Sequence, residues 1–159
     1  MSSLSRRSLI ALASAAALSA CGGRREDRMT MFEDHPPLHA GETPQLRAKI
    51  DRWAREYDVP ATLVHRVVQR ESRYNPGARN GPYMGLMQIH PRTAQGMGYS
   101  GSPQGLLDPD TNMKYAVKYL RGAWLVSDGS EEKAVGWYAR GYYYEAKRRG
   151  LLKETGLRT

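Results

Sequence analysis

The chain has 159 residues, among them 24 lysines and arginines, 16 aspartates and glutamates and one cysteine, and its net charge is +8 at pH 7. A single cysteine excludes an internal disulfide, and no arginine-rich tract is interleaved with aromatic residues, which argues against nucleic-acid binding. The positive charge favours anionic partners in general.

Residues 1–20 are predicted to be a signal peptide. Two arginines precede an apolar run over residues 9–20, and this run is shorter than the roughly 20 apolar residues that cross a membrane. It ends in Leu18-Ser19-Ala20-Cys21-Gly22, which resembles a bacterial lipobox, so we expect cleavage before Cys21 and lipidation of its thiol. The alternative is a free thiol after an ordinary signal peptide. The pair Arg6-Arg7 also resembles a twin-arginine export signal, although it equally fits an ordinary basic leader.

Residues 21–43 are predicted to form a lipidated, flexible tether, because they are rich in Gly, Pro and charged residues and show no apolar period. Removal of residues 1–20 takes away two arginines and no acidic residue, so the net charge falls from +8 to +6. In an exported protein this charge favours acidic cell-wall polymer or anionic lipid headgroups. We therefore expect a periplasmic protein anchored to an envelope membrane, with the outer membrane favoured. Residues 44–159 suffice for one compact domain.

The folded part is predicted to begin with two consecutive helices. Thr43 is expected to cap the first helix, with Pro44 in its first turn. Asp58-Val59-Pro60 ends this helix and starts the second, which runs toward Tyr74-Asn75-Pro76-Gly77. The apolar face of the first helix consists of Leu46, Ile50, Trp53 and Tyr57.

The remainder is predicted to be helical apart from one turn-rich segment. Asn80-Gly81-Pro82 allows a tight loop or a short hairpin within residues 78–90. No segment shows sustained alternation of apolar and polar residues, so the fold class is mainly α with at most a small β-hairpin. The later elements are a short helix over 91–97, a loop over 96–105, a helix capped by Asp108, a helix beginning near Glu131, and a last helix over 142–149 that ends at Gly150.

One carboxylate stands where the apolar pattern of the second helix calls for a core residue. Leu63, Val64, Val67 and Val68 form one apolar stripe, and position 71 comes next on it. Burial and the negative end of the helix dipole both oppose a charged carboxylate there, so Glu71 is a candidate for a protonated general acid. The alternative is a structural role, in which Glu71 ends the helix and pairs with a neighbouring arginine.

Several short motifs follow one another at set places in the folded part. They are Tyr57-Asp58-Val59-Pro60, then Val67-Val68-Gln69-Arg70-Glu71-Ser72-Arg73-Tyr74-Asn75-Pro76, Gly85-Leu86-Met87-Gln88-Ile89, Leu107-Asp108-Pro109 with Asn112, Ala116-Val117-Lys118-Tyr119-Leu120, and Tyr138-Ala139-Arg140-Gly141. Together they resemble the soluble lytic transglycosylase family, collinearly over residues 44–145. Glu-Ser-x-aromatic-Asn-Pro followed by Gly-Leu-Met-Gln is the specific combination.

The resemblance implies a goose-type-lysozyme-like domain that cleaves the β-1,4 bond between N-acetylmuramic acid and N-acetylglucosamine in peptidoglycan. Glu71 matches the catalytic residue of the family, which acts as acid and then as base and leaves 1,6-anhydromuramoyl ends without a cofactor. Tyr138 matches the tyrosine whose hydroxyl approaches that acid. The substrate-binding residues that the resemblance implies are Met87, Gln88, Asn80 and Tyr83.

The sequence departs from the family pattern beside Tyr138. Ala139 stands where the family has Asn, and Trp137 stands where it has a small residue. The loop between Glu71 and Gly85 is also about one residue short. These departures put the substrate preference in doubt. The candidates to rebuild the rim are Arg140 and Tyr142–Tyr144, which equally fit a packing role in the last helix.

No second catalytic carboxylate and no metal site are predicted. Asp108 is explained as a cap, Asp110 belongs to no motif, and Glu145 is not expected to face the cleft. The histidines at 35, 39, 65 and 90 look scattered and lack metal-ligand spacing. Two alternatives stay open. One is a lysozyme-type hydrolase that cleaves the same bond with water as the acceptor, and the other is a non-catalytic cell-wall-binding protein. The sequence does not identify a protein partner, and the partners that it predicts are peptidoglycan strands and, through Cys21, a membrane.

Overall fold

The computed structural model describes residues 36–157, so the predicted signal peptide, Cys21 and most of the predicted tether lie outside the described residues. The chain divides into one unit that ends at Pro37 and a second over Leu38–Thr159. All elements described below belong to the second unit. Among the described residues, no helix combines the length and the apolar character that a membrane span requires.

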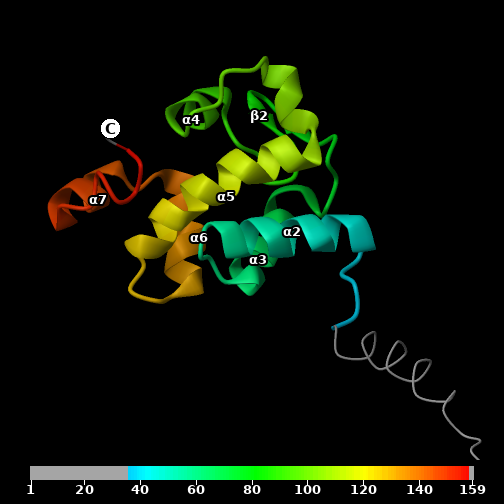
Figure 1. Cartoon of the computed structure of the whole chain (residues 1–159), viewed down its shortest axis with the longest axis horizontal. Coiled ribbons are helices and arrows are strands. Elements are labelled where there is room, and N and C mark those ends of the chain that lie inside the picture. The colour runs from blue at the N-terminus through cyan, green and yellow to red at the C-terminus, as the bar shows by residue number, and fades with distance from the viewer. Residues whose placement is uncertain (1–35, 158–159) are drawn as a thin grey trace, which may run out of the picture. The chain divides into compact units, whose positions relative to one another are not determined.

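The second unit consists of helices with one short hairpin (Figure 1). The strands pair antiparallel, with Arg79 opposite Met84 and Asn80 opposite Tyr83. The mainly α fold with a small hairpin is therefore confirmed. In chain order the elements are α2 (Pro44–Glu56), α3 (Ala61–Ser72), β1 (Arg79–Asn80), β2 (Tyr83–Met84), α4 (Pro91–Gly96), the 3-10 helix η1 (Pro103–Leu107), α5 (Pro109–Leu125), α6 (Glu131–Arg140) and α7 (Tyr143–Arg149).

Side-chain oxygens cap the starts of three helices, and the Nδ1 of His90 caps a fourth, α4. The Thr43 hydroxyl accepts the N–H of Leu46 at the start of α2, and the Asp108 carboxylate accepts the N–H of Thr111 at the start of α5. The Ser130 hydroxyl caps α6 in the same way. These bonds satisfy amide groups that have no partner within the helix, and they confirm the predicted starts of α2 and α5.

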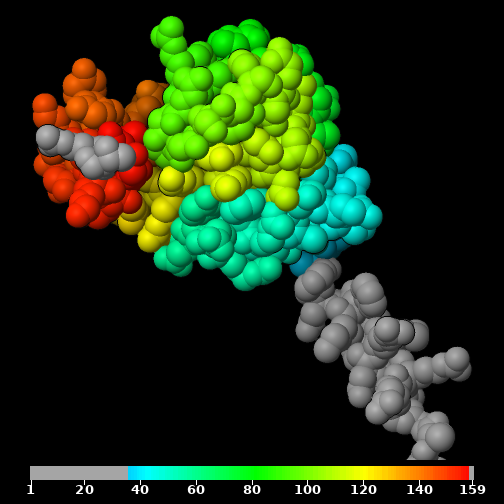
Figure 2. All heavy atoms as spheres, turned by 45° about the horizontal axis from the view of Figure 1, so that its top comes forward, coloured from blue at the N-terminus to red at the C-terminus, as the bar shows by residue number. Residues whose placement is uncertain are grey.

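Helix α5 is the central element of the unit. It contacts α2, α4, α6 and η1, while α3 contacts α2 and α6. Figure 2 shows only a narrow yellow band of α5 between the green segment that follows α3 and the cyan-to-teal α2. The contact between α3 and α6 brings the end of α3, where Glu71 lies, to Tyr138 on α6. The buried α5 residues are Asn112, Met113, Ala116, Val117, Leu120, Gly122 and Ala123.

The apolar stripe of α3 packs as the sequence predicts. Leu63, Val64, Val67 and Val68 have no exposed surface, so this face is fixed in the core by the hydrophobic effect. The helix ends at Ser72, and the next two residues, Arg73 (φ 51) and Tyr74 (φ 64), both adopt the left-handed conformation. This sharp corner follows Glu71 by two residues.

The compact unit begins earlier than the predicted domain boundary at Pro44. It includes residues 38–43, which the sequence assigns to the tether. The reason is Glu42, whose carboxylate has no exposed surface and is bound by Arg47. From composition alone, a charged residue such as Glu42 is expected to be solvated. Its burial depends on partners in α2 and α3, and composition does not reveal these partners.

Candidate active site

A cleft of about 330 Å³ lies where the end of α3, the hairpin and α6 meet. A second hollow of about 250 Å³ shares four lining residues with it, namely Tyr83, Gln88, Tyr138 and Ala139. The two hollows therefore form one groove. The first is lined by Arg70, Glu71, Asn80, Tyr83, Gln88, Tyr138 and Ala139, which include five of the six predicted catalytic and substrate-binding residues.

Glu71 presents a partly buried carboxyl to this cleft. Its side chain is 24% exposed, and the nearest cation is the Nε of Arg70, 3.5 Å from Oε1. Within residues 36–157 the carboxylate forms no hydrogen bond. Burial raises the pKa of Glu71 above its ordinary value, and the charge of Arg70 offsets part of that rise. Glu71 therefore holds a proton to a higher pH than a solvated glutamate does.

Tyr138 lies beside Glu71 but does not donate to it. The phenol is buried, and its hydroxyl donates to the backbone carbonyl of Met87 at 2.8 Å. Burial and the nearby Glu71 raise the pKa of Tyr138 well above its usual range, so the phenol is neutral and not a base. With its one proton committed to Met87, the hydroxyl can only accept a hydrogen bond from Glu71, which favours the protonated form of that carboxyl.

The structure places Met87 differently from the sequence expectation. Its side chain has no exposed surface and does not line the cleft. Its backbone contributes instead, since the carbonyl receives the Tyr138 hydroxyl and the N–H donates to Asn112. The sequence does not predict that the Met87 side chain is buried, because the segment around Met87 has no periodicity from which the direction of a side chain follows.

Gln88 does line the cleft, and its backbone is left-handed with φ 47. Both hydrogens of its amide have backbone acceptors, the carbonyl of Gly85 at 2.8 Å and that of Ala78 at 3.1 Å. The amide oxygen of this cleft-lining residue has no hydrogen bond within the described residues and is available as an acceptor. On the hairpin, Asn80 and Tyr83 line the same cleft, and Tyr83 is 46% exposed with its ring edge-on to His90.

Asn112 is a site-building residue that the sequence reasoning did not single out. It is fully buried, and its amide oxygen accepts the N–H of Met87 at 3.0 Å. Its amide nitrogen donates to the carbonyls of Met84 and Leu106, both at 2.8 Å. One side chain on α5 thus fixes the segment that carries Gln88. A signal was present, since Asn112 belongs to a family motif one turn after the Asp108 cap.

The comparison with known families agrees with this geometry. Residues 48–154 match the family described as Transglycosylase SLT domain. The chain belongs to this family. Its activity is therefore of the peptidoglycan lytic transglycosylase type, its substrate is peptidoglycan, and it acts on the cell wall. The match also confirms the lysozyme-like character of the fold.

The rim of this SLT domain is formed where the sequence departs from the family pattern. Ala139 lines the cleft, and the guanidinium of Arg140 lies 3.9 Å from the ring centroid of Trp137 and borders the second hollow. Tyr142 has a packing role, because it is buried and donates to the carbonyl of Tyr119. Arg140 is thus the rim residue, while the neighbouring tyrosines on α7 are exposed outside both hollows.

The other carboxylates considered from the sequence do not line the groove. Asp108 caps α5, and Asp110 pairs with Lys49 and Arg52 on α2 and accepts the indole N–H of Trp53. Glu145 is bound by Arg148 and Arg149, and these bonds hold its pKa at about 2. The cleft therefore contains one carboxylate among its lining residues, Glu71.

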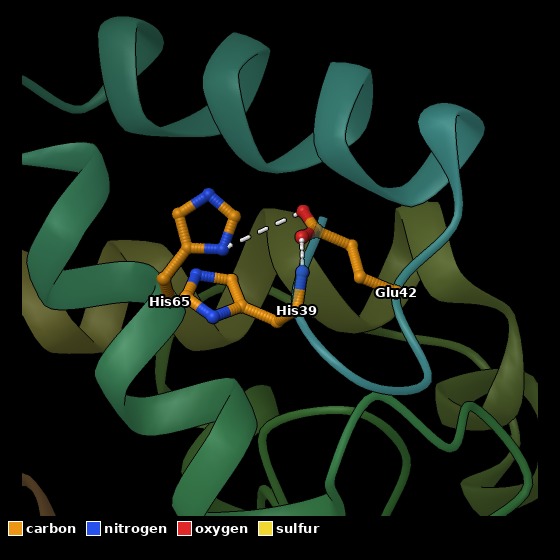
Figure 3. A group of neighbouring side chains, drawn as sticks. All are labelled: His39, Glu42 and His65. Carbon is orange, nitrogen blue, oxygen red and sulfur yellow. Dashed lines mark hydrogen bonds and ion pairs between the residues drawn. The ribbon is translucent and has the colours of Figure 1, made fainter. Parts of the chain in front are cut away.

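The histidines are not all scattered, as the sequence suggested. His39 and His65 converge on Glu42, with the three potential ligand atoms within 4.8 Å of one another (Figure 3). Sequence spacing hid this group because His65 lies on α3, far along the chain from the other two. Most of the potential metal-ligand atoms of this group already have partners, so the three residues do not fit an open metal site. Arg47 binds both oxygens of Glu42, and Tyr74 bonds the Nδ1 of His65 at 2.9 Å.

We expect Asn112→Ala to destabilise the SLT domain strongly. The substitution leaves the N–H of Met87 and the carbonyl of Leu106 without partners, at about 1–3 kcal/mol each, while the carbonyl of Met84 keeps its bond from the Ile89 N–H. The loss is therefore about 2 kcal/mol or more. Urea unfolding followed by circular dichroism measures it. Asn75→Ala is the control, because that exposed amide accepts one local bond and should cost less than about 1 kcal/mol. Equal losses in the two variants would contradict the central role of Asn112.

Proposed function

We propose that this domain cleaves the β-1,4 bond between N-acetylmuramic acid and N-acetylglucosamine and leaves 1,6-anhydromuramoyl ends, with Glu71 as acid and then base. The observation that carries the proposal is the single carboxyl of the cleft. It is partly buried, its pKa is raised, and no second carboxylate lines the cleft. A reaction that needs two carboxylates, as most glycoside hydrolases do, lacks its second group here.

In the first step Glu71 gives its proton to the glycosidic oxygen, and the bond from that oxygen to the anomeric carbon breaks. The positive charge that develops at the anomeric carbon is met by the N-acetyl group of the same sugar. Tyr138 supports this step as an acceptor that favours the protonated acid beforehand. Its hydroxyl is held in place by the bond to Met87.

In the second step the Glu71 carboxylate takes the proton of the muramoyl 6-hydroxyl, whose oxygen bonds to the anomeric carbon. Glu71 is then protonated again and the cycle closes. The acceptor belongs to the reacting sugar, and intramolecular acceptors reach effective molarities of about 10⁵ M or more. Water would need its own base on the opposite face, and no lining residue of the cleft supplies one.

The groove also offers groups suited to a glycan. The Gln88 oxygen can accept an N–H or O–H of a sugar, because its amide hydrogens are already bound. Tyr83 exposes an aromatic ring, which suits stacking on a pyranose face, and Asn80 adds an amide at the hairpin. Arg140 extends the rim beside the second hollow. These four residues are our candidates for substrate contacts.

We also propose that the mature protein starts at a lipidated Cys21 and is held at the periplasmic side of an envelope membrane, preferably the outer membrane. The support is the lipobox-like sequence before Cys21. Several acyl chains, at about 0.8 kcal/mol per buried CH₂, anchor a protein firmly where one chain is marginal. The residues up to Pro37 would then let the domain reach the wall.

The anchor is tested with Cys21→Ser in the full-length chain. We expect wild type in the membrane fraction with an acylated N-terminus detected by mass spectrometry. The variant should be released as soluble protein or remain unprocessed. Fully soluble wild type with a free thiol would contradict the anchor.

Glu71→Gln should abolish turnover of isolated sacculi while helical content and cooperative unfolding persist. Because the acid form is the active one, kcat should fall as pH rises through the raised pKa of Glu71. Arg70→Gln removes the cation that stabilises the charged form, so this alkaline limb should move to higher pH. The control is Arg66→Gln on the same helix, α3, which loses an ion pair with Glu131 of α6 and should leave the limb in place. Activity of Glu71→Gln above a few per cent would refute the assignment.

Digested sacculi should release anhydro muropeptides, which are one water lighter than hydrolysed ones, as mass spectrometry detects. Tyr138→Phe loses the bond to Met87 and the acceptor for Glu71, so the rate should fall about 10-fold or more with the product unchanged. Predominantly hydrated ends would favour the lysozyme-type hydrolase. Binding to sacculi with no turnover by wild type would favour the non-catalytic alternative.

A further inference from the structure

The position of Glu71 is set by backbone and not by bonds to its own carboxylate. No described hydrogen bond reaches the carboxylate, and its ion pair with Arg70 joins adjacent residues. Whatever holds the last turn of α3 therefore holds the carboxyl. The turn is followed directly by Arg73 and Tyr74 in the left-handed conformation, which non-glycine residues adopt at a cost and keep only where their surroundings impose it.

The surroundings that hold this corner come from the segment just before α2. Gly41, with φ 84, lies so close to the corner that an added Cβ would meet the Arg73 carbonyl oxygen at 2.7 Å. The ring of His39 stacks on the buried ring of Tyr74, with 5.6 Å between centroids and 13° between planes. Backbone and side-chain contacts thus press this segment onto the two strained residues.

Glu42 fixes the segment itself. Burial alone would raise the pKa of Glu42, but the bonds from Arg47 and from the His39 N–H hold this pKa below its ordinary value. The Arg47 bonds are 3.0 and 2.7 Å long, and the His39 N–H lies 2.8 Å from the second oxygen. Oε1 of Glu42 also lies 3.7 Å from the Nδ1 of His65, which in turn bonds the Tyr74 hydroxyl. The contacts therefore run from α2 to the corner and to α3.

We propose that His39, Gly41 and Glu42 form an N-terminal clamp that positions Glu71 by holding the Arg73–Tyr74 corner at the end of α3. The three are positioning residues and not catalytic ones, because none lines the cleft. The inference rests on the proposed function of Glu71. It makes residues 38–43 a working part of the catalytic domain, although they precede the family match at residue 48.

The test uses the full-length chain with Gly41→Ala and Glu42→Gln. A Cβ at position 41 must displace the Arg73 carbonyl, and a Gln amide at position 42 sets a donor against the donors of Arg47 and His39. We expect kcat on soluble glycan strands to fall about 10-fold or more, with KM within about twofold, because small displacements of a reacting group cost rate. Temperatures below the unfolding transition of each variant keep the molecules folded.

Two matched controls carry the same chemical changes elsewhere. Gly129→Ala places a methyl at φ 75 in the turn before α6, where nothing lies within 4 Å. Glu56→Gln removes a charge from the exposed end of α2. Both should keep kcat within about twofold of wild type. Equal losses of kcat in the controls and the clamp variants would overturn the proposal.

Two further readouts separate positioning from a general loss of stability. If the clamp variants let Glu71 move toward solvent, its pKa falls and the alkaline limb of kcat shifts to lower pH. Amide exchange should accelerate at residues 73–75 and stay unchanged in α5. If both variants keep the wild-type pH profile and the wild-type amide exchange at this corner, the clamp is refuted. The proposed function would still stand in that case, because it depends on turnover by the wild type. Absence of wild-type turnover would instead refute the proposed function.

Discussion

The cleft depends on the hydrogen bonds that the side-chain amide of Asn112 forms with backbone groups. This one residue, which has no exposed surface, bonds three backbone groups: the carbonyl of Met84 in β2, the N–H of Met87 and the carbonyl of Leu106 in η1. A buried polar network of this kind stabilises one arrangement only, because every alternative leaves unpaired groups. Gly85 makes the approach possible, since a Cβ there would collide with the Asn112 amide and with the Leu106 carbonyl. Helix α5 thereby determines where Gln88 points.

Two supports of different character meet at Glu71. The apolar stripe of α3 fixes the helix through nondirectional burial, which tolerates small rotations and shifts. The corner after Ser72 is fixed by directional contacts from His39, Gly41 and Glu42. Burial sets the environment that raises the pKa of Glu71, and the directional contacts set its place against Tyr138. The Glu71 carboxyl is thus held in place without a hydrogen bond of its own, which would favour its charged form.

Local chemistry explains how much was predictable. The caps at Thr43 and Asp108 act within three residues, and the α3 stripe repeats within one helix, so the helices, the hairpin and the candidate acid follow from the sequence. Met87 and Gln88 are neighbours in an aperiodic segment, where a left-handed residue decides which side chain enters the core. The burial of Glu42 depends on His65 and Tyr74, which only the packing of α2 against α3 brings near. Neither the composition nor the hydrophobic periodicity of the sequence predicts such contacts.

The bond from Tyr138 to the Met87 carbonyl ties α6 to the segment on the far side of the cleft. These two walls cannot separate without leaving a buried donor and acceptor unpaired, so the groove keeps its width before any glycan arrives. Association then resembles the docking of two preformed surfaces, and the ordering entropy lost on binding comes chiefly from the flexible polymer. The encounter rate should be governed by how a strand reaches the groove and not by the closing of a lid.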